Sequence, residues 1–392
     1  MPTANDSAPQ LEESTRVLTA PRAPSPAAHP RLASVATALP ANTVPQSATR
    51  ALAAHMFEEG LDPDDRRLLA VFESSGIETR HFCMPLEWYA QVRTFGEMNA
   101  RYLEHAVALA LEVSSRAIER AGLSPADVDH VVFVSSTGLA TPSVDARLAN
   151  LAAFRSDVRR TPIWGLGCAG GASGLARARD FALADPSARV LLVALELCSL
   201  TFQRRDLDRR NLVAAALFAD GAAAAIILGA EARVPAANGS GSGARALELV
   251  ASRSMLWPDT LDVMGWDVDE RGLHVIFSRD IPTIVRDWVR PNLDSFLAAN
   301  GTSLEQLGHV VAHPGGPKVL AAYAEALGLP PIAFRHARDV LRECGNMSSP
   351  TCLFVLERAL AAGDIRPGDS AVLAALGPGF SSELVLMRGA EM

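Results

Sequence analysis

The chain has 392 residues, a formal net charge of −8, and 49% hydrophobic against 20% charged residues. This composition supplies enough apolar material for a large packed core, and at about 150 residues per domain the length predicts two or three domains. The negative net charge argues against nucleic acid as a partner. The sequence contains no run of 18 uninterrupted apolar residues, so no membrane span is expected.

The N-terminal segment 1–30 is rich in Pro, Ala and Ser and contains few large apolar residues. It is therefore predicted to be a disordered tail, and it lacks the apolar segment of an export signal. The odd number of cysteines, five in a long chain, argues against a secreted disulfide scaffold. We therefore expect a cytoplasmic protein with free thiols.

The ordered part is predicted to begin near Arg31 with a buried strand. Further strands are expected at 128–136, 189–199 and 222–229, where apolar and β-branched residues dominate. Between the strand near Arg31 and the strand at 128–136, residues 98–122 place apolar side chains at helical spacing. This alternation of strands and helices is typical of a layered α/β fold.

The chain divides into two halves, 31–240 and 241–392, and the segment 235–245 predicts a loop where they meet. Each half contains a polar residue in a turn of small residues, followed by a helix and then a strand. In the first half this residue is Cys168, and in the second half it is Asn346. The two residues are expected to face the same internal layer.

The strongest candidate nucleophile is Cys168, which lies in the stretch Trp164-Gly-Leu-Gly-Cys-Ala-Gly-Gly-Ala-Ser-Gly174. The glycines allow a tight strand-to-helix turn. A thiol at a helix N-terminus is favoured as thiolate, the form that carries an acyl group as a thioester. A buried structural thiol is the alternative for an isolated cysteine, and we keep that interpretation for the other four.

Two further polar residues lie in loops rich in glycine or serine. His313 follows an apolar run in Val310-Val-Ala-His-Pro-Gly-Gly-Pro317, and Asn346 lies in Gly345-Asn-Met-Ser-Ser349. A lone histidine is more often structural, and an asparagine in such a turn is by default a helix cap. The proline and paired glycines after His313 favour a functional role, because they fix the loop and leave its backbone open to a ligand.

Five motifs occur in one order: Gly-x-Gly-Cys-Ala-Gly-Gly, Leu217-Phe-Ala-Asp-Gly-Ala-Ala223, His-Pro-Gly-Gly-Pro, Gly-Asn-Met-Ser-Ser and Gly377-Pro-Gly379. From about residue 31 to 390 the chain resembles the type III polyketide synthases, the chalcone synthase-like family. The resemblance implies a thiolase-like five-layer αβαβα fold built from two similar halves.

The resemblance also implies a chemistry. Cys168 would carry the acyl group of a starter acyl-CoA, and His313 would pair with its thiolate. His313 and Asn346 would donate hydrogen bonds to the thioester oxygen of malonyl-CoA during decarboxylation, and Phe218 would be the aromatic gatekeeper. No metal or redox cofactor is implied. The expected assembly is a homodimer in which Thr141 approaches the partner's cavity.

Further positions follow from the same resemblance. Val275 occupies a position that is aromatic in many relatives, and the remaining residues expected to line the substrate cavity are Thr141, Thr201, Gly265, Ser348, Gly377, Pro378 and Gly379. The residues expected to contact CoA are Arg67, Gly315, Gly316 and Lys318. The two basic side chains in that group are equally compatible with solvated surface charges.

The stretch 264–282 resembles the bacterial branch that makes alkylresorcinols and alkylpyrones from fatty acyl starters. A long apolar channel is therefore expected. Trp266 and Val263 suit the wall of such a channel, although ordinary core packing explains them as well.

Two alternatives remain open at the level of sequence. An initiating ketoacyl-ACP synthase has the same fold and trio, but it typically carries His-Gln-Ala-Asn where this chain has His-Pro-Gly-Gly. A non-catalytic thiolase-fold protein that only binds acyl chains is the other, and the presence of Cys168, His313 and Asn346 disfavours it.

Overall fold

The computed structural model describes residues 28–57, 69–204, 206, 208–234 and 246–390. Its framework is a nine-stranded mixed sheet in the order β11-β12-β13-β8-β1-β7-β6-β4-β5. The strands of this sheet are β1 (Arg31–Ala38), β4 (His130–Val134), β5 (Arg159–Ile163), β6 (Arg189–Leu197), β7 (Asp220–Leu228), β8 (Ala246–Leu256), β11 (His309–Ala312), β12 (Ser370–Gly377) and β13 (Ser381–Ala390). Two small sheets pair β2 (Asn42–Pro45) with β3 (Thr79–Phe82) and β9 (Met264–Asp269) with β10 (Gly272–Phe277).

The sheet consists of two halves with one topology. In the first half β1 and β7 are antiparallel, β7 and β6 are antiparallel, and β6 and β4 are parallel. In the second half β8-β13, β13-β12 and β12-β11 repeat the same sequence of directions. Within the described part of the nine-stranded sheet, the ladder that joins the halves consists of two residue pairs of β1 and β8. The predicted fold of two similar halves is therefore confirmed, whereas the predicted loop at 235–245 lies outside the described residues.

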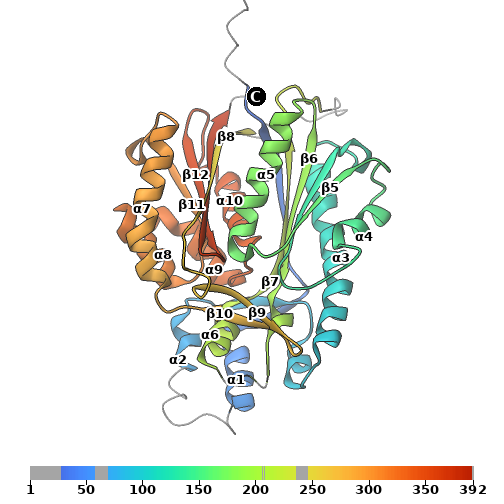
Figure 1. Cartoon of the computed structure of the whole chain (residues 1–392), viewed down its shortest axis with the longest axis vertical. Helices are drawn as coiled ribbons and strands as arrows, with labels where there is room; N and C mark the ends of the chain where they lie inside the picture. The colour runs from blue at the N-terminus through green and yellow to red at the C-terminus, as the bar shows by residue number, and fades with distance from the viewer. Residues whose placement is uncertain (1–27, 58–68, 205, 207, 235–245, 391–392) are drawn as a thin grey trace, which may run out of the picture.

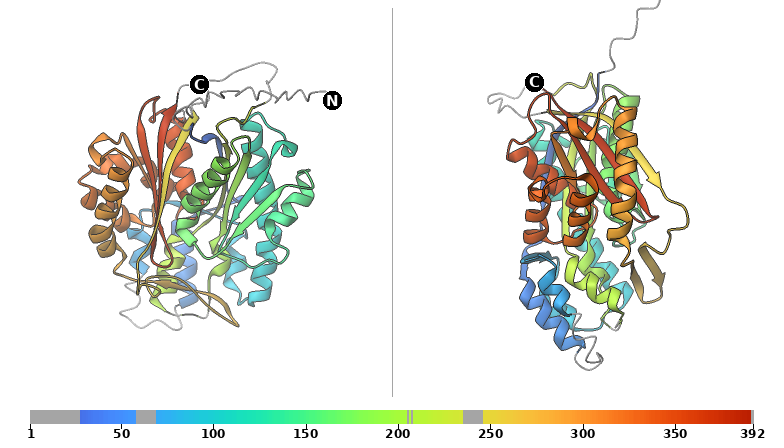
Figure 2. Two further views of the ribbon diagram at one scale, coloured as in Figure 1. Left: turned by 45° about the horizontal axis from the view of Figure 1, so that its top comes forward. Right: turned by 90° about the vertical axis from the view of Figure 1, so that its left-hand side faces the viewer.

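The helices complete five layers, with α5 and α10 between the two halves of the sheet, α7 and α8 outside one half, and α3 and α4 outside the other (Figures 1 and 2). The helices are α1 (Gln46–Phe57), α2 (Ala70–Ser74), α3 (Phe95–Arg120), α4 (Val144–Leu151), α5 (Gly170–Ala184), α6 (Arg209–Leu217), α7 (Ile281–Ala299), α8 (Pro317–Leu327), α9 (Arg335–Cys344) and α10 (Thr351–Ala361).

The central strands are buried on both faces, which explains their unbroken apolar sequences. Along β7, Ala222, Ala224 and Ile226 pack into the core under α3, whereas Ala223 and Ala225 pack into the core around α5 and α10. Successive side chains of a strand point to opposite faces, so one strand contributes to both cores.

The elements expected from the sequence are present. The predicted strands correspond to β1, β4, β6 and β7, and the predicted helix at 98–122 corresponds to α3. The first turn of α3 is closed by a capping box, in which Glu97 N donates to Thr94 Oγ1 (3.2 Å) and Thr94 N donates to Glu97 Oε2 (2.8 Å).

The described fold begins three residues before β1, although residues 1–30 are predicted to be a tail. Pro30 is buried, and its carbonyl oxygen accepts a hydrogen bond from Leu249 N at 2.8 Å. The ordered domain therefore includes at least this residue, which ties β1 to β8. Within the described residues, no helix is long and apolar enough to cross a membrane.

Candidate active site

Cys168 lies in a 3₁₀ turn, Gly167–Ala169, which leads directly into α5. The turn requires glycine: Gly167 has a φ of +46°, and a Cβ there would stand 2.9 Å from Pro378 Cδ. Gly377 packs from the same side, where a Cβ would meet Leu166 O at 2.5 Å. The Gly377-Pro378 segment at the end of β12 therefore covers the turn that holds the thiol, and Cys168 is only 6% exposed.

His313 follows β11 and remains tied to the sheet, because its backbone N–H donates to Ala374 O at 2.9 Å. The imidazole is buried, and neither ring nitrogen has a hydrogen-bond partner in the described structure. A buried ring with two unpaired nitrogens is costly unless a ligand uses them. The sequence predicted a loop residue at the mouth of a strand, and the structure confirms the loop but buries the side chain.

Asn346 lies between the other two candidate catalytic residues, Cys168 and His313. Its Nδ2 donates to Gly315 O at 3.3 Å, and Gly315 N donates to His313 O at 3.1 Å, so Asn346 is joined to the histidine loop. Its Oδ1 accepts from Ser348 N at 2.8 Å. The Asn346 and Ser348 side chains both lower the pKa of the Cys168 thiol, which places them on its side of the site. The structure therefore brings these residues together from both halves of the chain.

Burial sets the protonation of the thiol and the imidazole. Desolvation raises the pKa of Cys168 to about 11, although hydrogen bonds from Ser348 and Asn346 lower it. Desolvation also lowers the pKa of His313 to about 3. Both groups are thus favoured as neutral species, and burial outweighs the helix dipole that the sequence suggested would favour thiolate. An ion pair between the Cys168 thiolate and the His313 imidazolium forms only if the attraction between the two charges offsets the desolvation cost of burying them.

Two buried carboxylates have raised pKa values, and sequence reasoning missed both: Glu196 interacts with the Cys168 thiol, whereas Asp220 accepts hydrogen bonds from Cys83 N and Ser199. Burial raises the pKa of Glu196 to about 7, despite hydrogen bonds from Ser136 N (2.8 Å), Thr137 Oγ1 (2.8 Å) and Ser349 Oγ (2.8 Å). Burial likewise raises the pKa of Asp220 to about 6. The sequence did contain a signal for Glu196, because it is a glutamate within the apolar strand β6. A buried charge needs hydrogen-bonding partners, so this residue could have been recognised as part of a buried polar cluster.

Phe218 is held by backbone contacts with Asn346 and by a buried arginine. Phe218 and Asn346 form a parallel β-bridge, in which Asn346 N donates to Leu217 O at 2.9 Å. Arg80 Nη1 donates to Phe218 O at 2.8 Å. Gly345 makes room for this arginine, because a Cβ there would stand 2.9 Å from Arg80 Cγ. The predicted gatekeeper is therefore fixed beside the predicted oxygen-binding asparagine.

An apolar pocket, partly open to solvent, begins at Phe218 and encloses a cavity of about 60 Å³. Phe218, Thr201 and Val275, all predicted from the sequence, line it together with Trp266. Its other walls come from α1, α2 and α6, through side chains that include Leu52, Ala53, Met56, Phe72, Ala214 and Ala215. Cys168, His313 and Asn346 are not among the lining residues, so Phe218 stands at the boundary between pocket and catalytic trio.

The remaining predicted residues are dispersed. Gly265 lies in β9 and is not among the residues that line this pocket, and a Cβ there would meet nothing within 4 Å, so its place in the substrate cavity stays a prediction. Thr141 and Lys318 are exposed. Arg67 lies outside the described residues. Gly315 and Gly316 precede α8, and no group of acidic, histidine or cysteine side chains in the described part of the chain could hold a metal ion.

Family models extend these findings to known proteins. The model of the N-terminal domain of chalcone and stilbene synthases matches residues 20–232, and the model of their C-terminal domain matches residues 248–391. The chain is 42% identical over 365 residues to a putative chalcone synthase of Bacillus subtilis, covering 90% of this chain and 97% of the relative. It is 43% identical over 359 residues to 1,3,6,8-tetrahydroxynaphthalene synthase of Streptomyces peucetius, covering 91% and 92%.

Among solved structures, 1,3,6,8-tetrahydroxynaphthalene synthase of Streptomyces coelicolor superposes with a TM-score of 0.84 at 32% identity, covering 92% of this chain and 99% of that chain. Fold and site together define an acyl-CoA condensing enzyme of the thiolase fold. The chain belongs to the chalcone and stilbene synthase family and is a type III polyketide synthase. The prediction of this family is confirmed, in preference to an initiating ketoacyl-ACP synthase or a silent scaffold.

The raised pKa of Glu196 predicts a pH dependence of stability. A glutamate in the unfolded chain ionises near pH 4.3, roughly, whereas this carboxyl ionises only near 7, so the folded state binds more protons between these values. Its contribution to stability therefore falls as pH rises from 5 to 8. Urea unfolding of wild type and Glu196→Gln should show the wild type losing about 2 kcal/mol relative to the variant over this range. A constant difference across the range contradicts the raised pKa.

Proposed function

We propose that this type III polyketide synthase loads a medium- or long-chain fatty acyl group from its CoA thioester onto Cys168, extends it with malonyl-CoA and cyclises the product to an alkylpyrone or alkylresorcinol. The observation that carries the proposal is the apolar pocket beside Phe218. A fatty acyl chain needs such a compartment next to the thioester, because each buried methylene contributes about 0.8 kcal/mol to binding.

Three polar side chains of the pocket wall are already engaged, which favours an alkyl occupant, whereas Arg80 in the same wall has no hydrogen-bond partner in the described structure for Nε and Nη2. Thr49 Oγ1 donates to Gln46 O, Thr201 Oγ1 donates to Cys198 O, and Asn211 Nδ2 donates to Gln203 O. Each of these groups is satisfied by a backbone carbonyl, so the wall presents mainly methyl, methylene and aromatic groups to a ligand.

Cys168 is the acyl carrier in this proposal. Its thiolate attacks the starter thioester, CoA thiolate leaves, and the acyl group becomes a thioester of Cys168. The single N–H of the neutral His313 ring and the second N–H of Asn346 Nδ2 are donors available to a substrate oxygen. They stabilise the enolate that forms when malonyl-CoA loses carbon dioxide, and this enolate attacks the Cys168 thioester.

The CoA portion of the substrate is proposed to bind beside the start of α8. Lys318 is exposed in the first turn of that helix, after Gly315 and Gly316, and its ammonium is available to phosphate. Arg67 is proposed as a second phosphate contact on the sequence resemblance alone.

The nucleophile assignment predicts a separation of two activities. Cys168→Ala should abolish condensation, because no acyl-enzyme can form, whereas Cys168→Gln should still decarboxylate malonyl-CoA through His313 and Asn346. Product formation and carbon dioxide release are measured separately for each variant. Cys344→Ala, which removes another buried thiol, is the matched control and should keep both activities. Polyketide formation by either Cys168 variant at the wild-type rate would overturn the assignment.

The pocket predicts starter preference. In a competition assay, decanoyl-CoA should outcompete coumaroyl-CoA, and Val275→Phe should penalise long starters more than short ones by narrowing the passage. A starter longer by four methylenes gains up to about 3 kcal/mol where the pocket holds it. Equal slowing of all starters by Val275→Phe contradicts the proposal.

The relatives named 1,3,6,8-tetrahydroxynaphthalene synthase favour a second candidate, because a tetrahydroxynaphthalene carries no alkyl chain. Mass spectrometry of products formed from malonyl-CoA alone separates the two. A hydroxylated naphthalene formed faster than any alkyl product would replace the proposal by this second function.

The working form is proposed to be a homodimer through the surface around Thr141. Three large apolar side chains are exposed in this region: Leu139 (42%), Leu151 (60%) and Trp164 (49%). Sedimentation should give a particle of twice 41.5 kDa, and Trp164→Glu should dissociate it. Ile332→Glu, which changes an exposed apolar residue (65%) elsewhere, is the control and should leave the dimer intact. A monomeric wild type at micromolar concentration contradicts the dimer.

A further inference from the structure

The hairpin of β9 and β10 forms one wall of the apolar pocket. Val275 and Trp266 are direct cross-strand partners, and both line the pocket. The hairpin pairs with no strand of the nine-stranded sheet. A two-stranded hairpin is only marginally stable by itself, so the place of this wall depends on side-chain contacts that anchor it.

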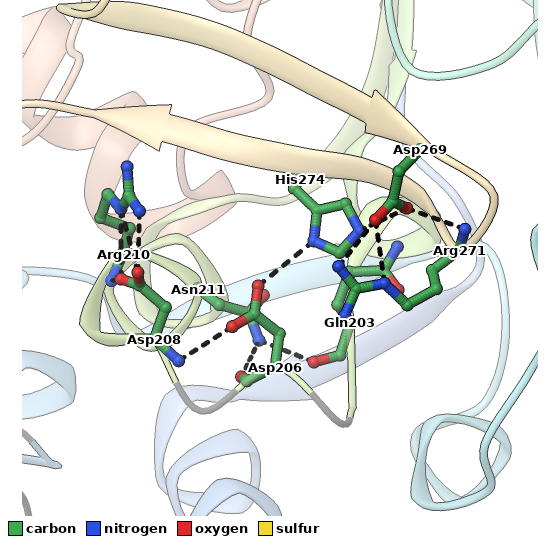
Figure 3. Close-up of polar contacts among 8 residues, drawn as sticks. All are labelled: Gln203, Asp206, Asp208, Arg210, Asn211, Asp269, Arg271 and His274. Atoms are coloured by element: carbon green, nitrogen blue, oxygen red, sulfur yellow. Dashed lines mark hydrogen bonds and ion pairs between the residues drawn. The ribbon is translucent and has the colours of Figure 1, made fainter.

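One histidine makes such a contact directly beside Val275. His274 is its neighbour in β10, and alternation along the strand directs the imidazole away from the Val275 side chain. The ring bridges two carboxylates: Nδ1 lies 3.3 Å from Asp206 Oδ2, and Nε2 lies 2.9 Å from Asp269 Oδ1 (Figure 3). Asp269 belongs to the hairpin, whereas Asp206 belongs to the segment that precedes α6. The ring therefore links the two parts.

The segment that receives His274 is itself fixed to α6. Asn211, a buried residue of α6, donates through Nδ2 to Gln203 O at 2.7 Å and to Asp206 O at 2.8 Å (Figure 3). Ala214 and Ala215, one turn further along α6, also line the pocket. A continuous path of contacts thus runs from the hairpin wall of the pocket through His274 to the wall that α6 contributes.

Asp269, the hairpin carboxylate that His274 contacts, is also held in place by other residues. Arg271 holds Asp269 from within the turn, with Nη2 2.6 Å from Oδ2 and the backbone N–H 2.8 Å from Oδ1. Gly272 starts β10 in close contact with the other segment, because a Cβ there would stand 2.9 Å from Gln203 Nε2. The Arg271 contact stays inside the hairpin, whereas the His274–Asp206 contact crosses from it to α6.

We propose that His274 is a positioning residue for starter selection: by tying the hairpin to the segment before α6, it fixes the separation of the pocket walls and so the length of acyl chain that the enzyme accepts. It touches neither the pocket nor the catalytic trio and acts through Val275 and Trp266. The proposal rests on the proposed role of the pocket as the starter site.

Two variants remove the link from opposite ends. His274→Leu and Asp206→Ala should each change the ratio of kcat/KM for decanoyl-CoA over hexanoyl-CoA by about fivefold, the size expected for loss of one net hydrogen bond. The change should appear in KM rather than kcat. The double variant should show no more than either single one, because both break the same contact. Decarboxylation of malonyl-CoA should stay within about twofold of wild type, as the trio is untouched.

Two further variants serve as controls. His274→Gln keeps an amide donor toward the carboxylates and should restore most of the wild-type ratio. Arg271→Gln removes a charge that also attracts Asp206, but it breaks no hydrogen bond between the hairpin and the segment before α6, and it should leave the ratio unchanged. An unchanged kcat/KM ratio in both His274→Leu and Asp206→Ala overturns the proposal. An equal loss of activity with all starters, accompanied by an equal loss of malonyl-CoA decarboxylation, would also overturn it, because that result indicates a merely structural role.

The failure of the proposed function is distinguishable from the failure of this inference. If wild type prefers coumaroyl-CoA or malonyl-CoA, the fatty acyl assignment falls. The inference still stands if His274→Leu and Asp206→Ala alter the ratio between a bulky and a small starter and Arg271→Gln does not. If His274→Leu and Asp206→Ala leave the kcat/KM ratio between large and small starters unchanged, whichever starter the wild type prefers, the inference itself is wrong.

Discussion

The parallel bridge between Phe218 and Asn346 is the interaction on which the site depends. The backbone N–H of Asn346 binds Leu217 O, and Ala219 N binds Asn346 O, each at 2.9 Å. This short pairing joins the end of α6 in the first half to the turn after α9 in the second. It sets Asn346 where its side chain reaches the Cys168 thiol and the loop of His313. Catalytic geometry is therefore a consequence of how the two halves pack.

Packing of this kind has an electrostatic cost. The layers that exclude water from Cys168 and His313 also favour the neutral form of each, and they raise the pKa values of Glu196 and Asp220. The same dry surroundings make hydrogen bonds to a developing oxyanion stronger than they would be in water. In the proposed mechanism, the enzyme thus loses some stability at neutral pH and gains a site where fixed donors act on charge that appears only during reaction.

In the proposed function, Phe218 separates the candidate catalytic residues from the pocket that selects the starter. One side of this residue is fixed by Asn346 and Arg80, and its ring lies 6.5 Å from Trp266 on the hairpin wall of the pocket. The catalytic side is built from the two large sheet halves and is rigid by burial. The pocket side is bounded by a hairpin outside that sheet, so changes there can alter the substrate without disturbing the trio.

The sequence alone determined the features that depend on neighbours in the chain. Glycines around Cys168 indicated a tight turn, unbroken apolar runs indicated strands buried on both faces, and the ordered motifs with His313 and Asn346 identified the family. These features could be predicted because backbone conformation and strand burial are written in local residue patterns.

Only the tertiary structure decided the features that depend on residues distant in the chain. It buried Cys168 and His313 deeply enough to oppose the helix dipole, placed Glu196 under the site, left Gly265 outside the pocket, and joined His274 to Asp206 across 68 positions. Desolvation and the shape of a cavity arise from the sum of all surrounding atoms. No local pattern contains that sum, so these properties appear only when the two halves come together.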